Sequence, residues 1–152
     1  MQLTQYTDYS LRVLIYLSQK EEGELATISE IAEFYGISRN HLVKVVHNLA
    51  TYGFIQTMRG KNGGMCLARP ADEIGIGDVV RQTEPNFDIA ECFNKQNNNC
   101  VITSVCAMKN ILGDARSNFI QTLDRYTLAD TLISRNGGAK KISFKLDRWA
   151  GK

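Results

Sequence analysis

The sequence has no apolar run long enough to cross a membrane. Its longest apolar run covers residues 13–17, whereas a membrane-spanning helix needs about 20 consecutive apolar residues. The first residues, Met-Gln-Leu-Thr, also lack the basic and apolar stretches of a secretory signal. These absences predict a soluble cytoplasmic protein with no membrane partner, in which the four cysteines stay reduced.

Several common metal and nucleotide sites are excluded by missing spacings. No C-x-x-C occurs, which excludes the zinc-ribbon and ferredoxin patterns. The two histidines, His41 and His47, are six residues apart and so do not form an i, i+4 metal pair. The glycine-rich stretch 59–64 lacks both the Walker spacing and a following helix, which argues against a nucleotide-binding loop.

The small net charge conceals an uneven distribution. The formal charge is +2 over 152 residues, but residues 137–152 hold five bases and one acid, so the rest of the chain is slightly acidic. Residues 34–71 contain no Asp or Glu. The bases in this acid-free stretch are Arg39, Lys44, Arg59, Lys61 and Arg69. A segment of one sign is a candidate surface for a polyanion such as nucleic acid.

The first half of the chain predicts a helix-turn-helix. A helix is expected over residues 4–19, where apolar residues recur at spacings of three and four. Thr27 and Glu30 match a capping box at the start of a second, short helix, which Gly36 ends. Ser38 is a suitable N-cap for a longer third helix that runs to about residue 52. Two helices joined by a tight glycine turn are typical of DNA-binding helix-turn-helix units.

The longer helix of this pair is predicted to read DNA. Its inward face is expected to hold Leu42, Val45, Val46, Leu49 and Tyr52. The remaining face carries no acid that would repel phosphate, and Arg, Asn and Lys are the side chains that read guanine, read adenine and hold phosphates. The expected contacts from this helix are Ser38, Arg39, Asn40, His41 and Lys44.

A β-hairpin is predicted after the helix-turn-helix. Residues 54–59 and 65–69 have strand-like composition, and Asn62-Gly63 between them is a hairpin signal because both residues tolerate a positive φ. We interpret the hairpin as a wing that lies along the minor groove, led by Arg59 or Lys61. The alternative is a tight hairpin whose charge is incidental.

The C-terminal half predicts a short helix near residues 76–82, an irregular segment, and a helix over 106–134, about 43 Å long at 1.5 Å per residue. Along that long helix a stripe of mainly apolar residues recurs with the 3.5-residue period of a coiled-coil seam. Its members are Met108, Leu112, Ala115, Phe119, Thr122, Tyr126, Ala129 and Ile133. A long helix with no second helix to cover it favours a homodimer, with packing on its own domain as the alternative.

The four cysteines fall into two groups. Cys66 stands mid-strand between apolar neighbours and is predicted to be a small buried residue. Cys92, Cys100 and Cys106 are separated by seven and five residues and bracket the irregular segment. Three clustered thiols in a reducing compartment suggest a metal site, with a redox disulfide pair or ordinary thiols as alternatives.

Four features of the sequence occur together: Leu-Thr-x-x-Thr-Asp-Tyr-Ser-Leu-Arg (3–12), Ser-Arg-Asn-His-Leu (38–42), the glycine-rich stretch 59–64 and the three cysteines. In these features the chain resembles the Rrf-type winged-helix iron–sulfur transcriptional regulators, in particular their nitric-oxide-sensing branch. The resemblance extends from residue 1 to about 134. The related cluster-assembly branch has a histidine three residues after its last cysteine. Lys109 occupies that position here, which argues against that branch.

This resemblance implies a homodimer that holds an iron–sulfur cluster, taken as 4Fe–4S with 2Fe–2S as the alternative. The implied ligands are Cys92, Cys100, Cys106 and, from the partner subunit, Asp8; Arg12 matches an arginine found beside that acid. A structural alternative for Asp8 is a first-turn carboxylate that favours the helix dipole and pairs with Arg12.

The resulting functional hypothesis is a DNA-binding repressor, not an enzyme, that senses nitric oxide through its cluster and releases its operator when the cluster is nitrosylated. A related regulator that senses iron–sulfur status or redox, with a 2Fe–2S cluster or none, is the alternative within the class. Other classes are an electron carrier or redox enzyme, which the missing C-x-x-C disfavours, and a helix-turn-helix subunit that acts on a protein partner.

The predicted organisation has four parts. Residues 1–84 form a winged helix-turn-helix DNA-binding domain, and residues 85–106 form the loop that bears the cysteines. Residues 107–135 form the dimerisation helix. Residues 136–152, which open with Gly-Gly, are expected to be a basic flexible tail.

Overall fold

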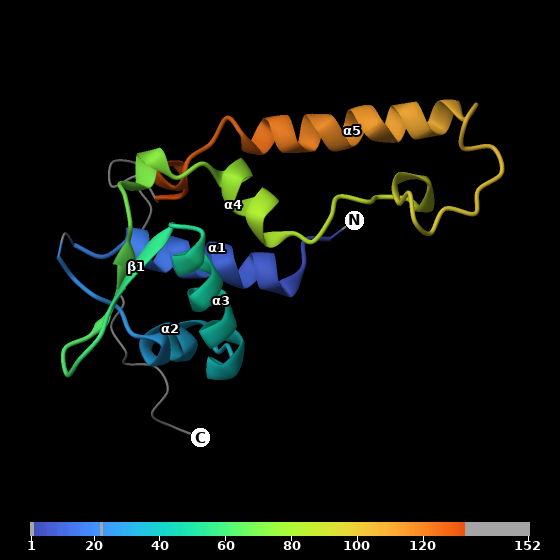
Figure 1. The fold of residues 1–152 in the computed structure, drawn as a ribbon. Coiled ribbons are helices and arrows are strands. Elements are labelled where there is room, and N and C mark those ends of the chain that lie inside the picture. Colours follow the sequence, from blue (N-terminus) through green and yellow to red (C-terminus); the bar gives the residue numbers. More distant parts are fainter. Residues whose placement is uncertain (1, 22, 133–152) are drawn as a thin grey trace, which may run out of the picture.

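Helices are the main regular structure in this computed structural model, which describes residues 2–21 and 23–132. Helices α1 to α4 and a two-stranded hairpin gather in one body, and α5 with the loop before it projects from that body (Figure 1). We call residues 85–123 the arm. The predicted fold class, mostly helical with a small hairpin, is confirmed. The predicted basic tail, 136–152, lies outside the described residues.

Helix α1 (Gln5–Ser18) confirms the first predicted helix to within one residue at each end. Thr4 is its N-cap, and the Thr4 hydroxyl accepts a hydrogen bond from the Thr7 amide at 3.2 Å. One face of the helix is buried and includes Val13 and Leu14, neither of which has any exposed surface. Helix α1 therefore supplies a central part of the core.

Helices α2 (Ile28–Tyr35) and α3 (Arg39–Thr51) form the predicted helix-turn-helix. Both hydrogen bonds of the capping box between Thr27 and Glu30 are present. Gly36 follows α2 with a φ of 64°, a left-handed conformation that glycine adopts at little cost. The cap and the glycine are local signals, which is why the sequence predicts these bounds well.

The core lies where the helices of the body meet. Helix α4 (Ile76–Thr83) packs against α1, and the 3₁₀ turn η1 (Ala71–Glu73) precedes it. A second such turn, η2 (Glu91–Phe93), lies in the arm. The fully buried large apolar side chains of the core are Val13, Leu14, Ile31, Leu42, Val45, Leu49, Ile74, Val79, Val80 and Leu128. Every helix of the body contributes to this set.

The hairpin consists of β1 (Ile55–Met58) and β2 (Gly64–Leu67), paired antiparallel. The predicted hairpin is confirmed, and five residues, 59–63, join its strands, one position earlier than the predicted loop 60–64. Within this fully described loop the positive φ of 119° belongs to Gly60 and not to Asn62 or Gly63, the two residues that signalled the hairpin.

Cys66 is half-buried, which corrects the prediction of a buried cysteine. It lies opposite Gln56 in the hairpin register. The neighbouring Met65 is the residue of β2 that faces the core, with 3% of its surface exposed. Met65 also exchanges two backbone hydrogen bonds with Ala26, at 2.8 and 2.9 Å, and these tie the hairpin to the segment that follows α1. That tertiary pairing decides which residues of β2 face inward.

The C-terminal helix is shorter than predicted. Helix α5 (Ala107–Leu123) has 17 residues, about 26 Å at 1.5 Å per residue, and does not extend to residue 134. Beyond it the chain turns back to the body, where the Tyr126 carbonyl accepts from the Ile76 amide at 2.9 Å and the Leu128 amide donates to the Ile74 carbonyl at 2.8 Å. Residues 124–132 therefore belong to the body and not to a dimerisation helix.

The reason for this early end is the burial of Leu128. Leu128 has no exposed surface and opens a 3₁₀ turn, η3 (Leu128–Thr131), that Thr127 and Asp130 cap. Leu128 lies off the apolar stripe that suggested a continuous helix. The stripe residue Tyr126 is instead 51% exposed. Burying a leucine in the core outweighs continuing the helix.

A group of hydrogen bonds joins the C-terminal end of α1 and the residues after it to α2, the first helix of the helix-turn-helix. The Tyr16 hydroxyl and the Lys20 ammonium both donate to Glu30, at 2.9 and 2.7 Å. Burial alone would raise the pKa of the Glu30 carboxyl, but hydrogen bonds from Lys20, the Thr27 amide and Tyr16 outweigh it and hold that pKa below its ordinary value. Burial, followed by the hydrogen bond to Glu30, raises the pKa of Tyr16.

Replacing the buried Leu128 should destabilise the body. We expect Leu128→Ala to lower the free energy of unfolding by about 2–5 kcal/mol, as for other buried leucines. The control is Val43→Ala at a position of α3 that is 47% exposed, where the change should stay within about 0.5 kcal/mol. Denaturant titration of both variants checks this. Equal, small effects would contradict the packing of residues 124–132 into the core.

Acid should weaken the link between α1 and α2. Because the pKa of Glu30 is lower in the folded chain, its ionised form stabilises the fold above the ordinary value of 4.5, and this contribution is lost as the pH falls through the lowered pKa. Glu30→Gln should therefore unfold with a shallower loss of stability below pH 4.5 than the unchanged chain. Thermal unfolding at a series of pH values measures this, and parallel curves for the two proteins would contradict it.

Candidate nucleic-acid interface and metal centre

The inward face of α3 is largely as predicted. Leu42, Val45, Val46 and Leu49 are buried. Tyr52, the fifth predicted residue, is 41% exposed, so that prediction is wrong. Tyr52 is the C-cap residue beyond the last helical turn, where helical spacing no longer fixes the direction of the side chain.

The predicted DNA contacts lie on the outer face of α3. All of them are exposed: Ser38, Arg39, Asn40, His41 and Lys44. Within the described part of the chain, neither Arg39 nor Lys44 forms an ion pair. Both cations are therefore available to phosphate or to base edges.

The first turn of α3 is open to an anion. Ser38 occupies the predicted N-cap position, but its hydroxyl makes no capping hydrogen bond. The amides at the start of a helix have no partner within the helix, and the helix dipole makes this end favourable for negative charge. An open N-terminus beside two exposed bases suits a DNA phosphate.

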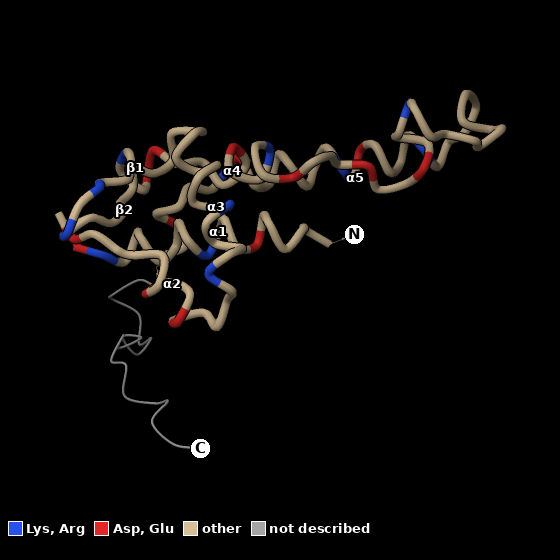
Figure 2. Tube along the Cα trace, turned by 60° about the horizontal axis from the view of Figure 1, so that its bottom comes forward, with Lys and Arg blue, Asp and Glu red and all other residues tan. Residues whose placement is uncertain are grey.

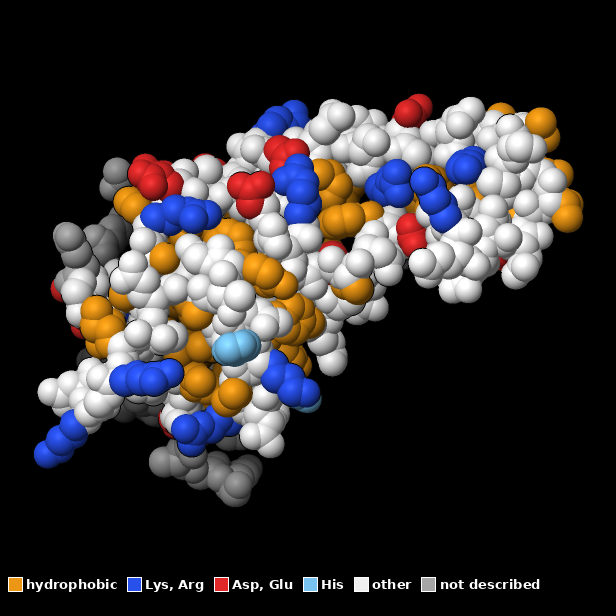
Figure 3. Space-filling view, in the orientation of Figure 1, with side chains coloured by type: hydrophobic (Ala, Val, Ile, Leu, Met, Phe, Trp, Pro, Cys, Tyr) orange, Lys and Arg blue, Asp and Glu red, His pale blue; other side chains and the backbone are white. Residues whose placement is uncertain are grey.

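The hairpin lies beside the start of α3. Arg59 and Lys61 are exposed at its tip. A hollow of about 250 Å³ is lined by Arg39 of α3 together with Met58 and Gly63 of the hairpin, among other residues. Figure 3 shows Lys and Arg side chains on the lower part of this face, over α3 and the hairpin, while most of the visible acids lie higher. The helix and the hairpin thus present one basic surface.

Arg69 does not belong to this surface, although it lies in the acid-free stretch. Its guanidinium lies 5.4 Å from the centre of the Phe54 ring. It also donates to the Glu73 carbonyl at 3.1 Å and to the Gly53 carbonyl at 3.4 Å. Arg69 therefore fastens the end of the hairpin, a role that charge alone does not reveal.

Helix α1 connects Asp8 to the recognition helix. The Asp8 carboxylate pairs with Arg12 at 2.9 Å, and both side chains are about 43–44% exposed. The next residue, Tyr9, stacks on His41 of α3 with ring centres 6.2 Å apart. Sequence reasoning missed this contact because the two residues are 32 positions apart and no local pattern relates them.

The three candidate cysteines lie in the arm. Cys92 is in η2 and Cys106 is the N-cap of α5, both half-buried, whereas Cys100 is exposed. Within residues 2–21 and 23–132, no three Cys, His, Asp or Glu side chains lie close enough together to hold a metal ion. The structure therefore places the three thiols on one segment without bringing them into a closed site.

The donor set nevertheless suits an iron–sulfur cluster. Thiolates are the ligands that hold such clusters. Cys106 is the N-cap residue of α5 and its side chain makes no capping hydrogen bond there. Around Cys100 the loop is ordered by its own hydrogen bonds, since the Cys100 amide donates to Asn98 at 3.1 Å and Thr103 donates to the Cys100 carbonyl at 2.8 Å.

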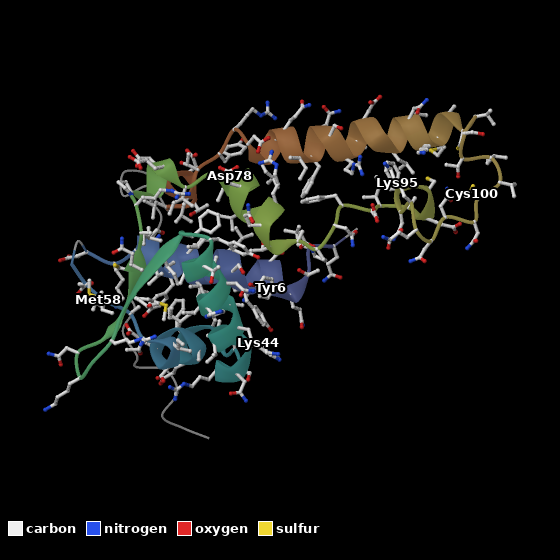
Figure 4. All side chains as sticks on the ribbon, viewed as in Figure 1. Tyr6, Lys44, Met58, Asp78, Lys95 and Cys100 are labelled. Carbon is white, nitrogen blue, oxygen red and sulfur yellow. The ribbon has the colours of Figure 1, made fainter. Side chains whose placement is uncertain are left out.

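The cysteines and Asp8 of the same chain lie far apart. Cys100 is at the outer end of the arm, while Tyr6, two residues before Asp8, is in the body (Figure 4). A view turned by 60° shows the same separation between α1 and the end of the arm (Figure 2). One chain therefore does not supply both parts of the implied ligand set.

Comparisons with known proteins identify the family of the chain. Residues 3–133 match the family Rrf2, described as iron-dependent transcriptional regulator. The chain belongs to the Rrf2 family. It is therefore a DNA-binding transcriptional regulator and not an enzyme. No helix in the described part of the chain is both long and apolar enough to span a membrane.

Within the Rrf2 family, similarity to named regulators covers nearly the whole chain. The chain is 45% identical over 143 residues to the HTH-type transcriptional regulator NsrR of Bacillus licheniformis, and the match covers 94% of this chain and 100% of that protein. Identity to NsrR of Bacillus subtilis is 46% over 145 residues, covering 95% and 99%. The structure resembles oxidised Staphylococcus aureus CymR, with a TM-score of 0.71, 26% identity and coverage of 88% and 99%.

Removing bases from this surface should reduce the salt dependence of DNA binding. For a regulator that binds phosphates, the slope of log K against log salt becomes shallower by about 0.9 for each phosphate that the protein no longer neutralises. We expect this change for Lys44→Ala and for Lys61→Ala. Lys95→Ala, on the exposed arm, is the matched control and should leave the slope unchanged. A fluorescence anisotropy titration at several salt concentrations measures the slopes, and equal slopes for all three variants would rule out this surface.

Proposed function

We propose that this chain is a homodimeric cytoplasmic repressor that senses nitric oxide through an iron–sulfur cluster and releases its operator when the cluster is nitrosylated. The observation that carries the proposal is the position of Asp8. It is adjacent to Tyr9, which stacks on His41 of the recognition helix. A change in what Asp8 binds would thus reach the DNA-reading surface through one neighbouring residue. The similarity to NsrR proteins supports the same function.

In this proposal the cluster would be held by Cys92, Cys100 and Cys106 of one protomer and by Asp8 of the partner subunit. When bound, it would supply iron that reacts with nitric oxide. A carboxylate is a harder and weaker ligand to such iron than a thiolate, so Asp8 of the partner subunit would be the ligand most easily displaced. A 4Fe–4S cluster is the form proposed, with 2Fe–2S as the alternative.

A second copy of the chain would cover the arm. Helix α5 has no buried residue, and the outer part of the arm exposes large apolar side chains. These are Val101, Ile102, Val105, Met108 and Ile111, of which Val101 is 95% exposed. Apolar surface of this extent on a projecting segment is typical of a protein–protein interface. A dimer that covers it also brings each arm to the other protomer.

Arg12 gives Asp8 an alternative partner. In the structure their side chains pair at 2.9 Å. Arg12 also lies over the Tyr35 ring, with its guanidinium carbon 5.7 Å from the ring centre, so its position is fixed on the α2 side of α1. If Asp8 were released from the cluster, its ion pair with Arg12 would hold the carboxylate on its own helix. The two arrangements of Asp8 define the two states of the switch.

The DNA-binding state requires the two recognition helices to reach successive major grooves, about 34 Å apart. In the proposal, bound Asp8 fixes each body against the arm of the other protomer and so fixes this separation. Loss of the link increases the freedom of the two bodies and lowers operator affinity.

The proposal is tested by anaerobic purification, absorption spectroscopy and DNA binding, with and without a nitric-oxide donor. We expect a coloured protein whose affinity for its operator falls when the donor bleaches the cluster absorption. The shape of the spectrum distinguishes a 4Fe–4S from a 2Fe–2S cluster. A colourless protein that binds DNA equally in both conditions would falsify the sensor function.

Single variants test the ligand set in the same assay. The cluster should survive Cys66→Ala, a half-buried hairpin cysteine, but not Cys92→Ala. Asp8→Ala should retain part of the cluster absorption while losing the difference in DNA binding between the two conditions. Normal cluster stability and a normal response in Asp8→Ala would remove Asp8 from the site.

A further inference from the structure

Helix α4 lies between the two parts of the molecule. Its eight residues include buried Val79 and Val80, which fix it in the body, and it packs against both α1 and α5. Figure 1 shows α4 below the end of α5 that adjoins the body. Any change in the direction of α5 relative to the body must therefore occur at the junction of these two helices.

A charged pair joins α4 to the end of α5. Arg81 Nη2 donates to both carboxylate oxygens of Asp124, at 2.6 and 2.5 Å, and Asp124 is the C-cap residue of α5. Arg81 Nη1 also donates to Asp78 at 3.2 Å, but Asp78 is on α4 itself. Asp78 is labelled beside this junction in Figure 4. Of the two carboxylates, Asp124 alone links separate helices.

Gly77 makes room for this pair. A methyl group at position 77 would overlap Asp124 Oδ1 and would also lie 3.1 Å from Arg81 Nη1. Because the obstructing atoms are the ends of side chains, an alanine here would displace the Asp124 carboxylate rather than the backbone. The absence of a side chain at Gly77 therefore leaves the space that the Asp124 carboxylate occupies beside α4.

The C-terminal end of α4, which has Arg81 in its last turn, also contacts the helix that bears Asp8. Glu84 Oε1 accepts hydrogen bonds from the Thr4 amide at 2.7 Å and from the Thr4 hydroxyl at 3.1 Å. Thr4 is the N-cap of α1, one turn before Asp8. Helix α4 thus has a polar contact to α5 at Arg81 and, at the next residue past its end, a polar contact to α1.

We propose that Arg81 and Asp124 are positioning residues that fix the angle of the arm to the DNA-binding body, and through it the half-site spacing that the dimer accepts on DNA. This inference rests on the proposed function only in requiring a dimer joined through its arms. It involves neither the cluster nor nitric oxide.

The length of α5 makes the half-site spacing on DNA sensitive to the contact between Arg81 and Asp124. Helix α5 is about 26 Å long, so a rotation of about 10° at its body end moves its far end by about 4–5 Å. That displacement exceeds the rise of one base pair, about 3.4 Å. One added or removed base pair also rotates one half-site by about 34° about the DNA axis. Loosening the junction in both protomers would therefore lower the cost of fitting DNA whose half-sites are one base pair closer or farther apart, without removing that cost.

The test compares operators that differ only in spacing. A binding site selected from a random DNA library by the unchanged protein is remade with one base pair added to or removed from its centre. We expect the unchanged protein to lose affinity about tenfold or more on these DNAs. Asp124→Asn and Gly77→Ala should reduce the loss to about threefold or less. Asp78→Asn, which removes the carboxylate that stays within α4, should keep the full loss.

Two controls separate this role from general destabilisation. Alanine favours helix more than glycine does, so Gly77→Ala should fold even if Asp124→Asn does not. Affinity for a single half-site should be equal in all variants. Retention of the tenfold loss by Gly77→Ala would overturn the inference while leaving the proposed function intact. If the unchanged protein bound all three spacings equally well, the positioning role of Arg81 and Asp124 would also be overturned. If the unchanged protein did not bind two half-sites at all, both this inference and the proposed function would be overturned.

Discussion

The burial of one face of α1 between α3 and α4 is the constraint on which the rest of the structure depends. Val13 and Leu14 of this helix have no exposed surface, and the helix contacts α3, α4, β2 and η3. The same helix carries Asp8 and Tyr9 on its less buried sides. Because α1 is packed into the core, a change in the ligand of Asp8 would alter the packing of α1 against the recognition helix.

The basic surface consists of the positively charged side chains that the fold leaves exposed. Arg39, Lys44, Arg59 and Lys61 remain exposed, whereas Arg69, from the same acid-free stretch, is fixed on Phe54 and two carbonyls. The unused cap at Ser38 adds a helix N-terminus to the same surface. Charge, helix dipole and the adjacent hairpin therefore act on one face.

Prediction from sequence succeeded where the signals are local. The capping box at Thr27, the left-handed Gly36 and the spacing of Leu42 and Leu49 each specify structure within a few residues, and the helix-turn-helix follows from them. Exposure of the expected DNA contacts followed for the same reason. The cysteines and Asp8 were proposed through a family resemblance, because their spacing alone left several chemistries open.

Apart from Tyr52 and the hairpin loop, the failures concern contacts between distant parts of the chain. Helix α5 ends early because Leu128 is buried in a core built by residues far earlier in the sequence. The half-burial of Cys66 follows from the pairing of Met65 with Ala26. Arg81 with Asp124 is likewise a pair that no local pattern marks, although it fixes the direction of the arm. Periodicity describes one element at a time and contains no information about such pairs.

The central claim is that the state of Asp8 sets the arrangement of the two recognition helices. Pulsed EPR between gadolinium labels on a noncanonical amino acid at position 43, where Val43 of α3 is 47% exposed, measures the separation of these helices in the cluster-loaded dimer. We expect one narrow distance distribution before nitric oxide, compatible with grooves about 34 Å apart, and a shifted or broadened one afterwards. An unchanged distribution, with the cluster spectrum bleached, would contradict it.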